Sequence, residues 1–343
     1  MATWWRSSRP WNRGSNGSRA RSSVAETGMK HIRNLCEVRL PASSLTIGSF
    51  DGVHLGHQAL LKAMVEHARQ AGVPSVVLTF FPHPSVVLRG RKPAFYINTP
   101  EEKAQRVSEF GVDIMITLRF DRALSEVGPE DFLTRLHDHL HFQDLWIGQD
   151  FAMGHNREGN RHFLEARSAA HGYRLHVIPR VLIEGEIVSS TRVREALRSG
   201  DVARVERYLG KPFMLPGRVV RGVGRGRSLS FPTANLAIWD ERAHPRSGVY
   251  ACLAEVQGAQ WQAVTNIGVR PTFGEGKPAP IVETHLLDFE GDLYDEIVRL
   301  SFFARLRDEQ KFPDAQALME RITRDIARAR EILDHRLEES HHA

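Results

Sequence analysis

The hydrophobic pattern of this sequence changes once, and that change limits what the chain can fold into. Between residues 45 and 209, short apolar runs alternate with longer segments of helical periodicity. After Gly210-Lys211-Pro212, strand-like runs follow one another without helices, separated by frequent Gly and Pro. The first pattern predicts a doubly wound parallel sheet, and the second predicts a small antiparallel barrel. We therefore expect an α/β domain over residues 29–210 and a β-barrel domain over residues 211–343.

Individual segments carry the two patterns. In the first domain, strands are predicted over Leu45–Phe50, Ser75–Phe80, Ile114–Leu118, Leu145–Ile147 and Leu175–Ile178. Helices are predicted over Gly56–Gln70, from Thr99, over Gly128–His139, over residues 160–171 and over Ser190–Tyr208. Barrel strands are predicted over Met214–Arg221, Ala234–Ile238, Gly248–Val256, Gln260–Ile267, Ile281–Leu287 and Glu296–Arg305. A terminal helix is predicted by an apolar stripe through Leu318, Ile322, Ile326, Ala329 and Leu333. At the second helix, Thr99 and Glu102 form a capping-box pattern around Pro100.

The positive charge of the chain is concentrated in its N-terminal tail. Residues 1–28 hold five arginines and Glu26, so the tail carries +4 of the total net charge of +5. The tail lacks the apolar segment of a secretory signal, and its low acid content resembles that of a transit peptide. We expect it to be disordered and dispensable, with Met29 as an alternative start, and we expect no nucleic-acid binding.

Cysteine content and hydropathy bear on the compartment. The two cysteines, Cys36 and Cys252, are far apart and form no Cys-x-x-Cys pair, which indicates a reducing compartment. No apolar run approaches the length of a membrane span. We expect a cytoplasmic protein that contacts no membrane and is a monomer or a weak homo-oligomer.

Two histidines follow the first predicted strand, in the segment Ile47-Gly-Ser-Phe-Asp-Gly-Val-His-Leu-Gly-His57. Ligands of open α/β sheets bind beyond the carboxyl ends of the strands, and helix N-termini attract phosphate. His54 and His57 would both reach one phosphate chain there, with Gly56 keeping the backbone close. Their N–H groups would stabilise charge on an α-phosphate under attack. The alternatives are a surface histidine pair and a metal site.

This segment resembles the HxGH signature of the nucleotidyltransferase superfamily, specifically its prokaryotic FAD synthetase branch. Thr79–Pro84 is similar to the TFxPHP segment of that branch, Gly148–Gly154 to GxDFxFG, and Ser189–Arg194 to SSTxxR. The sequence departs from the pattern at Phe81, Ala152 and Met153. The resemblance implies nucleotide or phosphate contacts for Gly48, Phe50, Asp51, Gly52, Gly56, Asp150, Ser190, Thr191 and Arg194. It implies flavin contacts for Pro82, His83, Phe151 and Arg157.

The second domain begins with a glycine-rich loop that contains Gly222, Gly224, Gly226 and Arg227. It is neither a P-loop, since Gly-Lys-Ser/Thr is absent, nor a dinucleotide fingerprint, since no helix is predicted after it. A mobile surface turn is the alternative to a nucleotide-binding loop.

Phe231–Leu236, which follows this loop, resembles the PTAN motif of riboflavin kinases. Thr233 and Asn235 lie two residues apart on a predicted strand, so their side chains share a face. Their oxygens suit Mg²⁺. Asn266–Phe273 is similar to the NIGxRPTF segment of these kinases, and Glu283 matches their catalytic carboxylate. The departures here are Arg225, Ser230 and Asp295.

The two resemblances cover roughly residues 45–335, with the transferase before the kinase, which is the order in the bifunctional prokaryotic family. They imply that riboflavin is phosphorylated to FMN and that FMN is adenylylated to FAD with release of pyrophosphate. ATP would be the co-substrate of both steps and Mg²⁺ the cofactor. Three alternatives remain: a single working activity, favoured as kinase-only by Ala152 and Met153; a non-catalytic flavin- or RNA-binding regulator; and a nucleotidyltransferase for another phosphate ester, in which the barrel would have no role.

Overall fold

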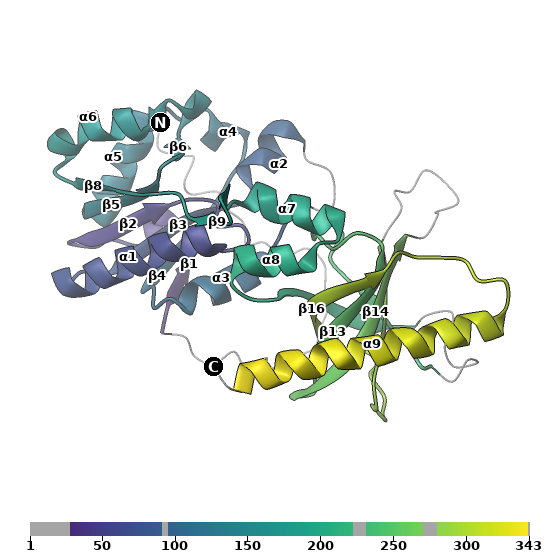
Figure 1. Ribbon diagram of the computed structural model, residues 1–343. Coiled ribbons are helices and arrows are strands. Elements are labelled where there is room, and N and C mark those ends of the chain that lie inside the picture. Colours follow the sequence, from purple (N-terminus) through teal and green to yellow (C-terminus); the bar gives the residue numbers. More distant parts are fainter. Residues whose placement is uncertain (1–27, 91–94, 222–230, 270–279, 342–343) are drawn as a thin grey trace. The chain divides into compact units, whose positions relative to one another are not determined.

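The computed structural model describes residues 28–90, 95–221, 231–269 and 280–341 of the 343-residue chain (Figure 1). The described residues form two compact units. The first holds those before position 91 together with Asn98–Ile187, and the second holds Phe95–Ile97 and those from Val188 onward. The domain boundary expected at residue 210 stays a prediction.

A parallel sheet forms the centre of the first unit, with the strand order β1-β4-β3-β2-β5-β8. Its strands are β1 (Lys30–Ile32), β2 (Ser43–Ile47), β3 (Ser75–Phe81), β4 (Ile114–Arg119), β5 (Phe142–Gly148) and β8 (Arg174–Ile178). Every neighbouring pair is parallel. β3 is rich in Val and Phe and its first five residues are buried, as expected for a strand that is covered on both faces.

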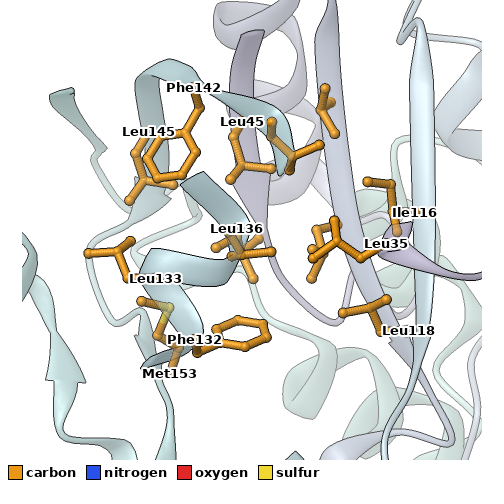
Figure 2. Close-up of a cluster of buried hydrophobic side chains, with 14 of the residues drawn as sticks. Leu35, Leu45, Ile116, Leu118, Phe132, Leu133, Leu136, Phe142, Leu145 and Met153 are labelled. Atoms are coloured by element: carbon orange, nitrogen blue, oxygen red, sulfur yellow. The ribbon is translucent and has the colours of Figure 1, made fainter. Parts of the chain in front are cut away.

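Helices cover both faces of this sheet. They are α1 (Leu55–Ala71), α2 (Pro84–Arg89), α3 (Pro100–Ser108), α4 (Arg122–Ser125), α5 (Pro129–Leu140) and α6 (Arg161–His171). Side chains of α1 and α3 share one buried cluster with sheet residues. Side chains of α5 and α6 form the opposite cluster, in which Phe132 and Leu136 of α5 meet Leu45 and Leu145 of the sheet (Figure 2). Helices on both faces confirm the doubly wound sheet.

Short elements complete the first unit. They are the 3₁₀ turns η1 (Leu35–Glu37) and η2 (His155–Arg157), the hairpin β9 (Leu182–Ile183) with β10 (Glu186–Ile187), and the pair β6 (Ala152–Met153) and β7 (Gly159–Asn160).

The strand order places the switch point of the sheet between β2 and β5. From β2, the chain continues through α1 to β3 and β4 on one side, whereas β5 and β8 lie on the other side. Because all strands are parallel, the segments after β2, β3 and β5 emerge at one edge. Three of the motif segments therefore begin at the edge where such sheets bind ligands.

A closed antiparallel barrel forms the second unit, in the order β11-β12-β15-β14-β13-β16. Its strands are β11 (Phe213–Val220), β12 (Ala234–Ala237), β13 (Gly248–Val256), β14 (Ala259–Val269), β15 (Pro280–Leu286) and β16 (Ile297–Arg307). The pairing of β11 with β16 closes the ring. The expected barrel is confirmed, and closure leaves no unpaired sheet edge among these strands.

Three helices belong to the barrel unit: α7 (Ser190–Ser199), α8 (Val202–Leu209) and α9 (Ala315–His341). α9 packs on β13, β14 and β16, and its Ala329 and Leu333 are fully buried against Ala251 and Leu253 of β13. The terminal helix predicted from its apolar stripe is therefore confirmed, and the stripe faces the barrel.

Several boundaries differ from the expectations: β5 begins at Phe142, three residues before the expected Leu145, and two other differences have a local cause. The helix expected over Ser190–Tyr208 is two helices, because Gly200 ends α7 in a left-handed conformation and the Asp201 side chain caps α8. The strand expected to reach Phe50 ends at Ile47, because Phe50 has a φ of 47°. The capping box of Thr99 and Glu102 is confirmed, with both reciprocal hydrogen bonds present.

We predict that Leu333→Ala lowers the free energy of unfolding of the barrel unit by about 2–5 kcal/mol, because it leaves a cavity at a fully buried position. Met319→Ala, at a partly exposed position of the same helix, is the matched control and should cost much less. Chemical denaturation followed by circular dichroism measures both. Equal losses for the two variants would show that α9 is not held by this stripe.

Candidate active sites

The turn after β2 has a conformation that ordinary residues adopt rarely. Phe50, Gly52 and Val53 have φ values of 47°, 86° and 41°. A left-handed conformation is unfavourable for Phe and for β-branched Val, so the surroundings must stabilise it. Burial does so, since Phe50 is 2% and Val53 0% exposed. Gln58 adds a hydrogen bond from its Nε2 to the Val53 carbonyl oxygen at 2.9 Å.

The two histidines stand together at the start of α1. His54 is the N-cap residue, and its Nδ1 accepts a hydrogen bond from the His57 backbone N–H at 3.4 Å. The two rings stack with centroids 3.7 Å apart. Burial, together with the nearby His54 and Lys103, holds the pKa of His57 well below its usual value. His57 is therefore neutral at pH 7, and its buried Nδ1 has no hydrogen-bond partner among the described residues.

Lys103 of α3 lies beneath this turn and is almost fully buried. Its Nζ donates hydrogen bonds to the Ser49 carbonyl oxygen at 2.8 Å and to the Thr79 hydroxyl oxygen at 3.3 Å. The Thr79 hydroxyl in turn donates to the Ser49 carbonyl oxygen at 3.1 Å. The ammonium thus ties the turn after β2 to the end of β3.

Charge around Lys103 is partly balanced by Asp51, which is also buried. Asp51 accepts a hydrogen bond from the Asn98 backbone N–H at 3.3 Å. Burial lowers the pKa of Lys103 to about 8, although the Asp51 carboxylate opposes this shift. Sequence reasoning missed Lys103, because a lysine in a helical pattern is ordinarily a surface residue.

The segment after β3 carries two of the predicted flavin-binding residues. Pro82 follows a cis peptide bond, and His83 is the N-cap of α2, where its Nδ1 accepts a hydrogen bond from the Ser85 backbone N–H at 3.0 Å. This capping bond uses one ring nitrogen, and the flavin contacts of Pro82 and His83 stay predictions.

Asp150, after β5, forms an ion pair with Arg180. The hydrogen bond from Arg180 lowers the pKa of Asp150 below its usual value. Arg157 donates to the Asp150 carbonyl oxygen at 3.2 Å. Phe151 packs partly against the buried cluster beneath the sheet. Phe151 and Arg157 therefore meet protein groups in this structure, and their flavin contacts stay predictions.

The SSTxxR segment lies in the second compact unit, at the N-terminus of α7. Ser190 and Thr191 occupy the first turn, and the Ser189 side chain caps the helix. Arg194 bonds the Phe95 carbonyl oxygen at 2.7 Å and stacks on the Phe95 ring at 4.0 Å. The contacts predicted between these residues and the nucleotide stay predictions.

Strand register defines the site in the barrel. Glu283 of β15 lies directly opposite Asn235 of β12 and directly opposite Asn266 of β14. Residues in such pairs have side chains on one face, about 4.5–5.5 Å apart at Cβ. Val282 and Thr284, the neighbours of Glu283, are buried, whereas Glu283 is partly exposed. One carboxylate thus stands between two carboxamides on the accessible face of the barrel wall.

A cavity of about 160 Å³ is lined by Asn235, at one end of this row, whereas Glu283 and Asn266 are not among its lining residues. Its lining includes Thr233 and Asn235 beside the segment Phe289–Tyr294. His285, two residues after Glu283, bonds the Pro232 carbonyl oxygen at 2.7 Å and so fixes the residue before Thr233. Sequence reasoning assigned His285 no role, although it lies two residues after Glu283. The predicted loop residues Gly222, Gly224, Gly226 and Arg227 lie outside the described residues.

These two units define the class of protein: a transferase with a nucleotidyltransferase-type parallel sheet followed by a kinase-type barrel. Residues 37–192 match the family model for FAD synthetase, and residues 209–333 match that for riboflavin kinase. The chain belongs to the family of bifunctional riboflavin kinase/FMN adenylyltransferases.

Curated relatives match nearly the whole chain. The bifunctional riboflavin kinase/FMN adenylyltransferase of Pseudomonas fluorescens is 40% identical over 287 residues, which are 83% of this chain and 91% of the relative. That of Escherichia coli K12 is 36% identical over 307 residues, which are 88% of this chain and 96% of the relative.

A crystal structure described as a macrolide-efflux protein from Streptococcus pneumoniae matches with a TM-score of 0.81 at 29% identity. It covers 88% of this chain and 98% of that one. Among the described residues, no helix has the length and apolar character of a membrane span. The family rests on the sequence relatives, and this match adds a solved structure of similar fold.

We predict that FAD formation from supplied FMN falls at least about fivefold between about pH 7.5 and 9.5, because Lys103 loses its charge as the pH passes its lowered pKa of about 8. The pH dependence of folding stability has the opposite sign to that of activity. An unfolded lysine titrates near 10.4, so the folded protein holds fewer protons between about pH 8 and 10.4 and the contribution of Lys103 to stability rises there.

Initial rates across this pH range check the prediction, with FMN formation from riboflavin as the internal control. Lys103→Met should be slower at pH 7.5 and should lose the alkaline decline. The same decline in Lys103→Met would assign it to another group.

Proposed function

We propose that this chain phosphorylates riboflavin to FMN in the barrel and adenylylates FMN to FAD at the parallel sheet, with ATP as the co-substrate of both reactions. The observation that carries the proposal is the row of Asn235, Glu283 and Asn266, in which Asn235 also lines the barrel cavity, because this row would supply a base and a cation ligand in a second unit. The family relatives carry both activities in their names.

In the barrel, Glu283 would accept the proton of the riboflavin 5′-hydroxyl. The hydroxyl oxygen then forms a bond to the γ-phosphorus of ATP, and the bond from that phosphorus to the β-bridging oxygen breaks, which releases ADP. Asn235 and Asn266 flank the carboxylate in the strand register, and the amide of Asn266 donates a hydrogen bond to Glu309 Oε1 at 3.4 Å in this structure.

Mg²⁺ is the cation that fits the donors at the cavity. Thr233 and Asn235 offer a hydroxyl and a carboxamide oxygen, which are hard ligands, and both line the cavity. We propose that these two residues hold the ion, whose charge would offset that of the phosphates.

At the sheet, the FMN phosphate oxygen would attack the α-phosphorus of ATP, and the bond to the pyrophosphate oxygen breaks. No covalent enzyme intermediate is needed, so positioning and charge stabilisation carry the rate. His54 and His57 lie at the N-terminus of α1, where backbone N–H groups and the helix dipole attract phosphate. The neutral His57 ring would donate an N–H to charge that develops on the α-phosphate.

We predict that the purified chain, given riboflavin, ATP and Mg²⁺, forms FMN first and FAD afterwards. The order follows because FMN is the product of one site and the substrate of the other. Chromatography of riboflavin, FMN and FAD over time measures it. FMN without FAD at high ATP would support the kinase-only alternative, and no conversion of either flavin would contradict the proposal.

We predict that Glu283→Gln slows FMN formation about 10²–10⁴-fold and leaves FAD formation from supplied FMN nearly unchanged, because the amide keeps the shape but takes no proton. His57→Ala should slow FAD formation about 10²–10³-fold and spare the kinase. Glu255→Gln and His162→Ala, at exposed positions, are the matched controls. If either site variant depressed both reactions equally while folded, the two sites would not be independent.

A further inference from the structure

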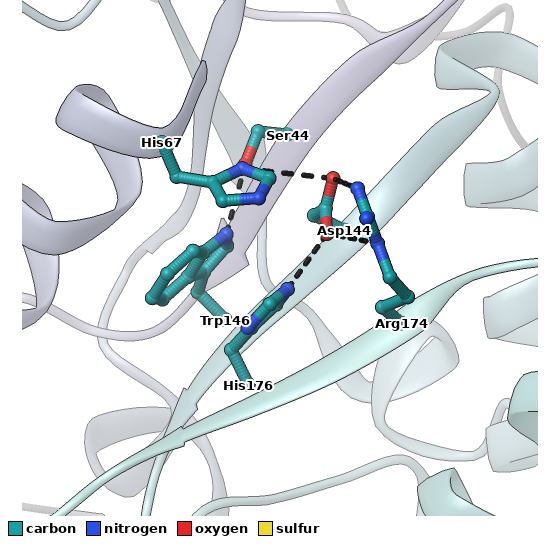
Figure 3. Close-up of polar contacts among 6 residues, drawn as sticks. All are labelled: Ser44, His67, Asp144, Trp146, Arg174 and His176. Carbon is teal, nitrogen blue, oxygen red and sulfur yellow. Dashed lines mark hydrogen bonds and ion pairs between the residues drawn. The ribbon is translucent and has the colours of Figure 1, made fainter. Parts of the chain in front are cut away.

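Three side chains with metal-binding atoms converge at the edge of the parallel sheet opposite the β2 turn. They are His67 in the last turns of α1, Asp144 near the start of β5 and His176 in β8. α1 begins at the turn after β2, and His67 lies near the other end of this helix. Figure 3 shows His67, Asp144 and His176 side by side. The cluster is therefore separate from both sites described above.

The donor atoms have the spacing of a metal shell. One ligand atom from each residue lies within 4.8 Å of the other two. His176 Nε2 is 2.7 Å from Asp144 Oδ1, and His67 Nδ1 is 3.7 Å from Asp144 Oδ2. Ligands at a tetrahedral zinc, with bonds of about 2.0–2.1 Å, stand about 3.3 Å apart. Small side-chain movements would bring all three atoms onto one ion.

Packing fixes the rings before any ion binds. The His176 ring stacks on Trp146 with centroids 4.1 Å apart, and the His67 ring meets the edge of the same indole at 5.4 Å. The indole is held in turn by a hydrogen bond from its Nε1 to the Ser44 hydroxyl oxygen at 2.9 Å. These contacts hold both imidazole rings in position beside Asp144.

Of the three residues in the cluster, His67 has a buried ring nitrogen that no hydrogen bond satisfies. Its Nδ1 is shielded from solvent and has no hydrogen-bond partner. A buried polar atom without a partner is costly, and an ion is one established reason for retaining such an atom. Replacing His67 therefore removes a metal-binding atom without removing a hydrogen bond of that atom, although it also removes the 3.7 Å approach to Asp144 and the contact with Trp146.

Arg174 is hydrogen-bonded to the Asp144 carboxylate in this structure. Its Nε and Nη2 bond the two Asp144 oxygens, each at 2.9 Å. Asp144 is fully buried, whereas the Arg174 side chain is 65% exposed. Burial opposes ionisation of Asp144, but the hydrogen bonds from Arg174 and His176 outweigh it and hold the pKa of Asp144 below its usual value. The carboxylate is thus ionised, and the guanidinium that pairs with it is largely exposed to solvent.

We propose that His67, Asp144 and His176 bind one divalent cation of the zinc class, in competition with the guanidinium of Arg174. Two imidazoles and one carboxylate suit Zn²⁺, Co²⁺ or Ni²⁺, whereas Mg²⁺ prefers oxygen ligands alone. The bound ion links α1 to β5 and β8, so it stabilises the folded first unit. It takes no part in the phosphate chemistry.

The test uses the full chain, freed of metal by a chelator. Equilibrium dialysis against Zn²⁺ should show one bound equivalent, Zn²⁺ should raise the melting temperature, and Co²⁺ should give the visible absorption of a four-coordinate site. His67→Gln should weaken binding at least about tenfold and abolish the thermal shift. His162→Ala, an exposed histidine outside the cluster, is the matched control.

Arg174→Gln tests whether Arg174 competes with the metal ion for Asp144 or only lies near it. It should raise the Zn²⁺ affinity severalfold, because it removes the group that competes for Asp144. Three results would overturn the proposal: no stoichiometric Zn²⁺ binding by the wild type, binding that His67→Gln leaves unchanged, or an affinity that Arg174→Gln lowers. Binding lost in His54→Ala but kept in His67→Gln would place the ion at the β2 turn and would also overturn it.

Discussion

The ammonium of Lys103 is hydrogen-bonded to the Ser49 carbonyl and the Thr79 hydroxyl, and the transferase site depends on this buried contact. Phe50 and Val53 hold unfavourable backbone angles, so the turn needs stabilisation from outside itself. The hydrogen bonds that Lys103 donates supply it, and its ammonium adds a positive charge near His57. The same charge helps to keep His57 neutral. Local strain, burial and electrostatics thus converge on one short segment.

In the barrel, strand register has the corresponding role. β15 pairs with β12 on one side and β14 on the other, which aligns Asn235, Glu283 and Asn266 in one row. A slip of one residue would turn Glu283 into the barrel interior. The buried Thr265–Thr284 hydroxyl pair and Val282, between the same strands, oppose that slip. The hydrophobic alternation of β15 therefore positions the carboxylate as well as the core.

The architecture could be predicted because its signals are local. Periodicity marked the strands and helices, and motif segments lay at strand ends, where a parallel sheet places them at one edge. The break at Gly200 and Asp201 also had a local signal, a C-cap glycine followed by an N-cap residue. Lys103 and the His67 cluster had none, because their contacts join residues distant in sequence. β1 is three residues long and too short for a periodic pattern. Ligand contacts for the individual motif residues stay predictions.

The central claim is that one chain carries two independent transfer sites that act in sequence. The direct measurement follows the phosphorus atoms of FAD made from riboflavin with ATP labelled at either the γ or the α position. The account predicts that FAD contains one phosphorus from each position, since the kinase transfers the γ-phosphoryl group and the transferase transfers the adenylyl group. FAD that carries no label from either form of ATP would contradict the account. FAD that carries label from the α position but none from the γ position would also contradict it.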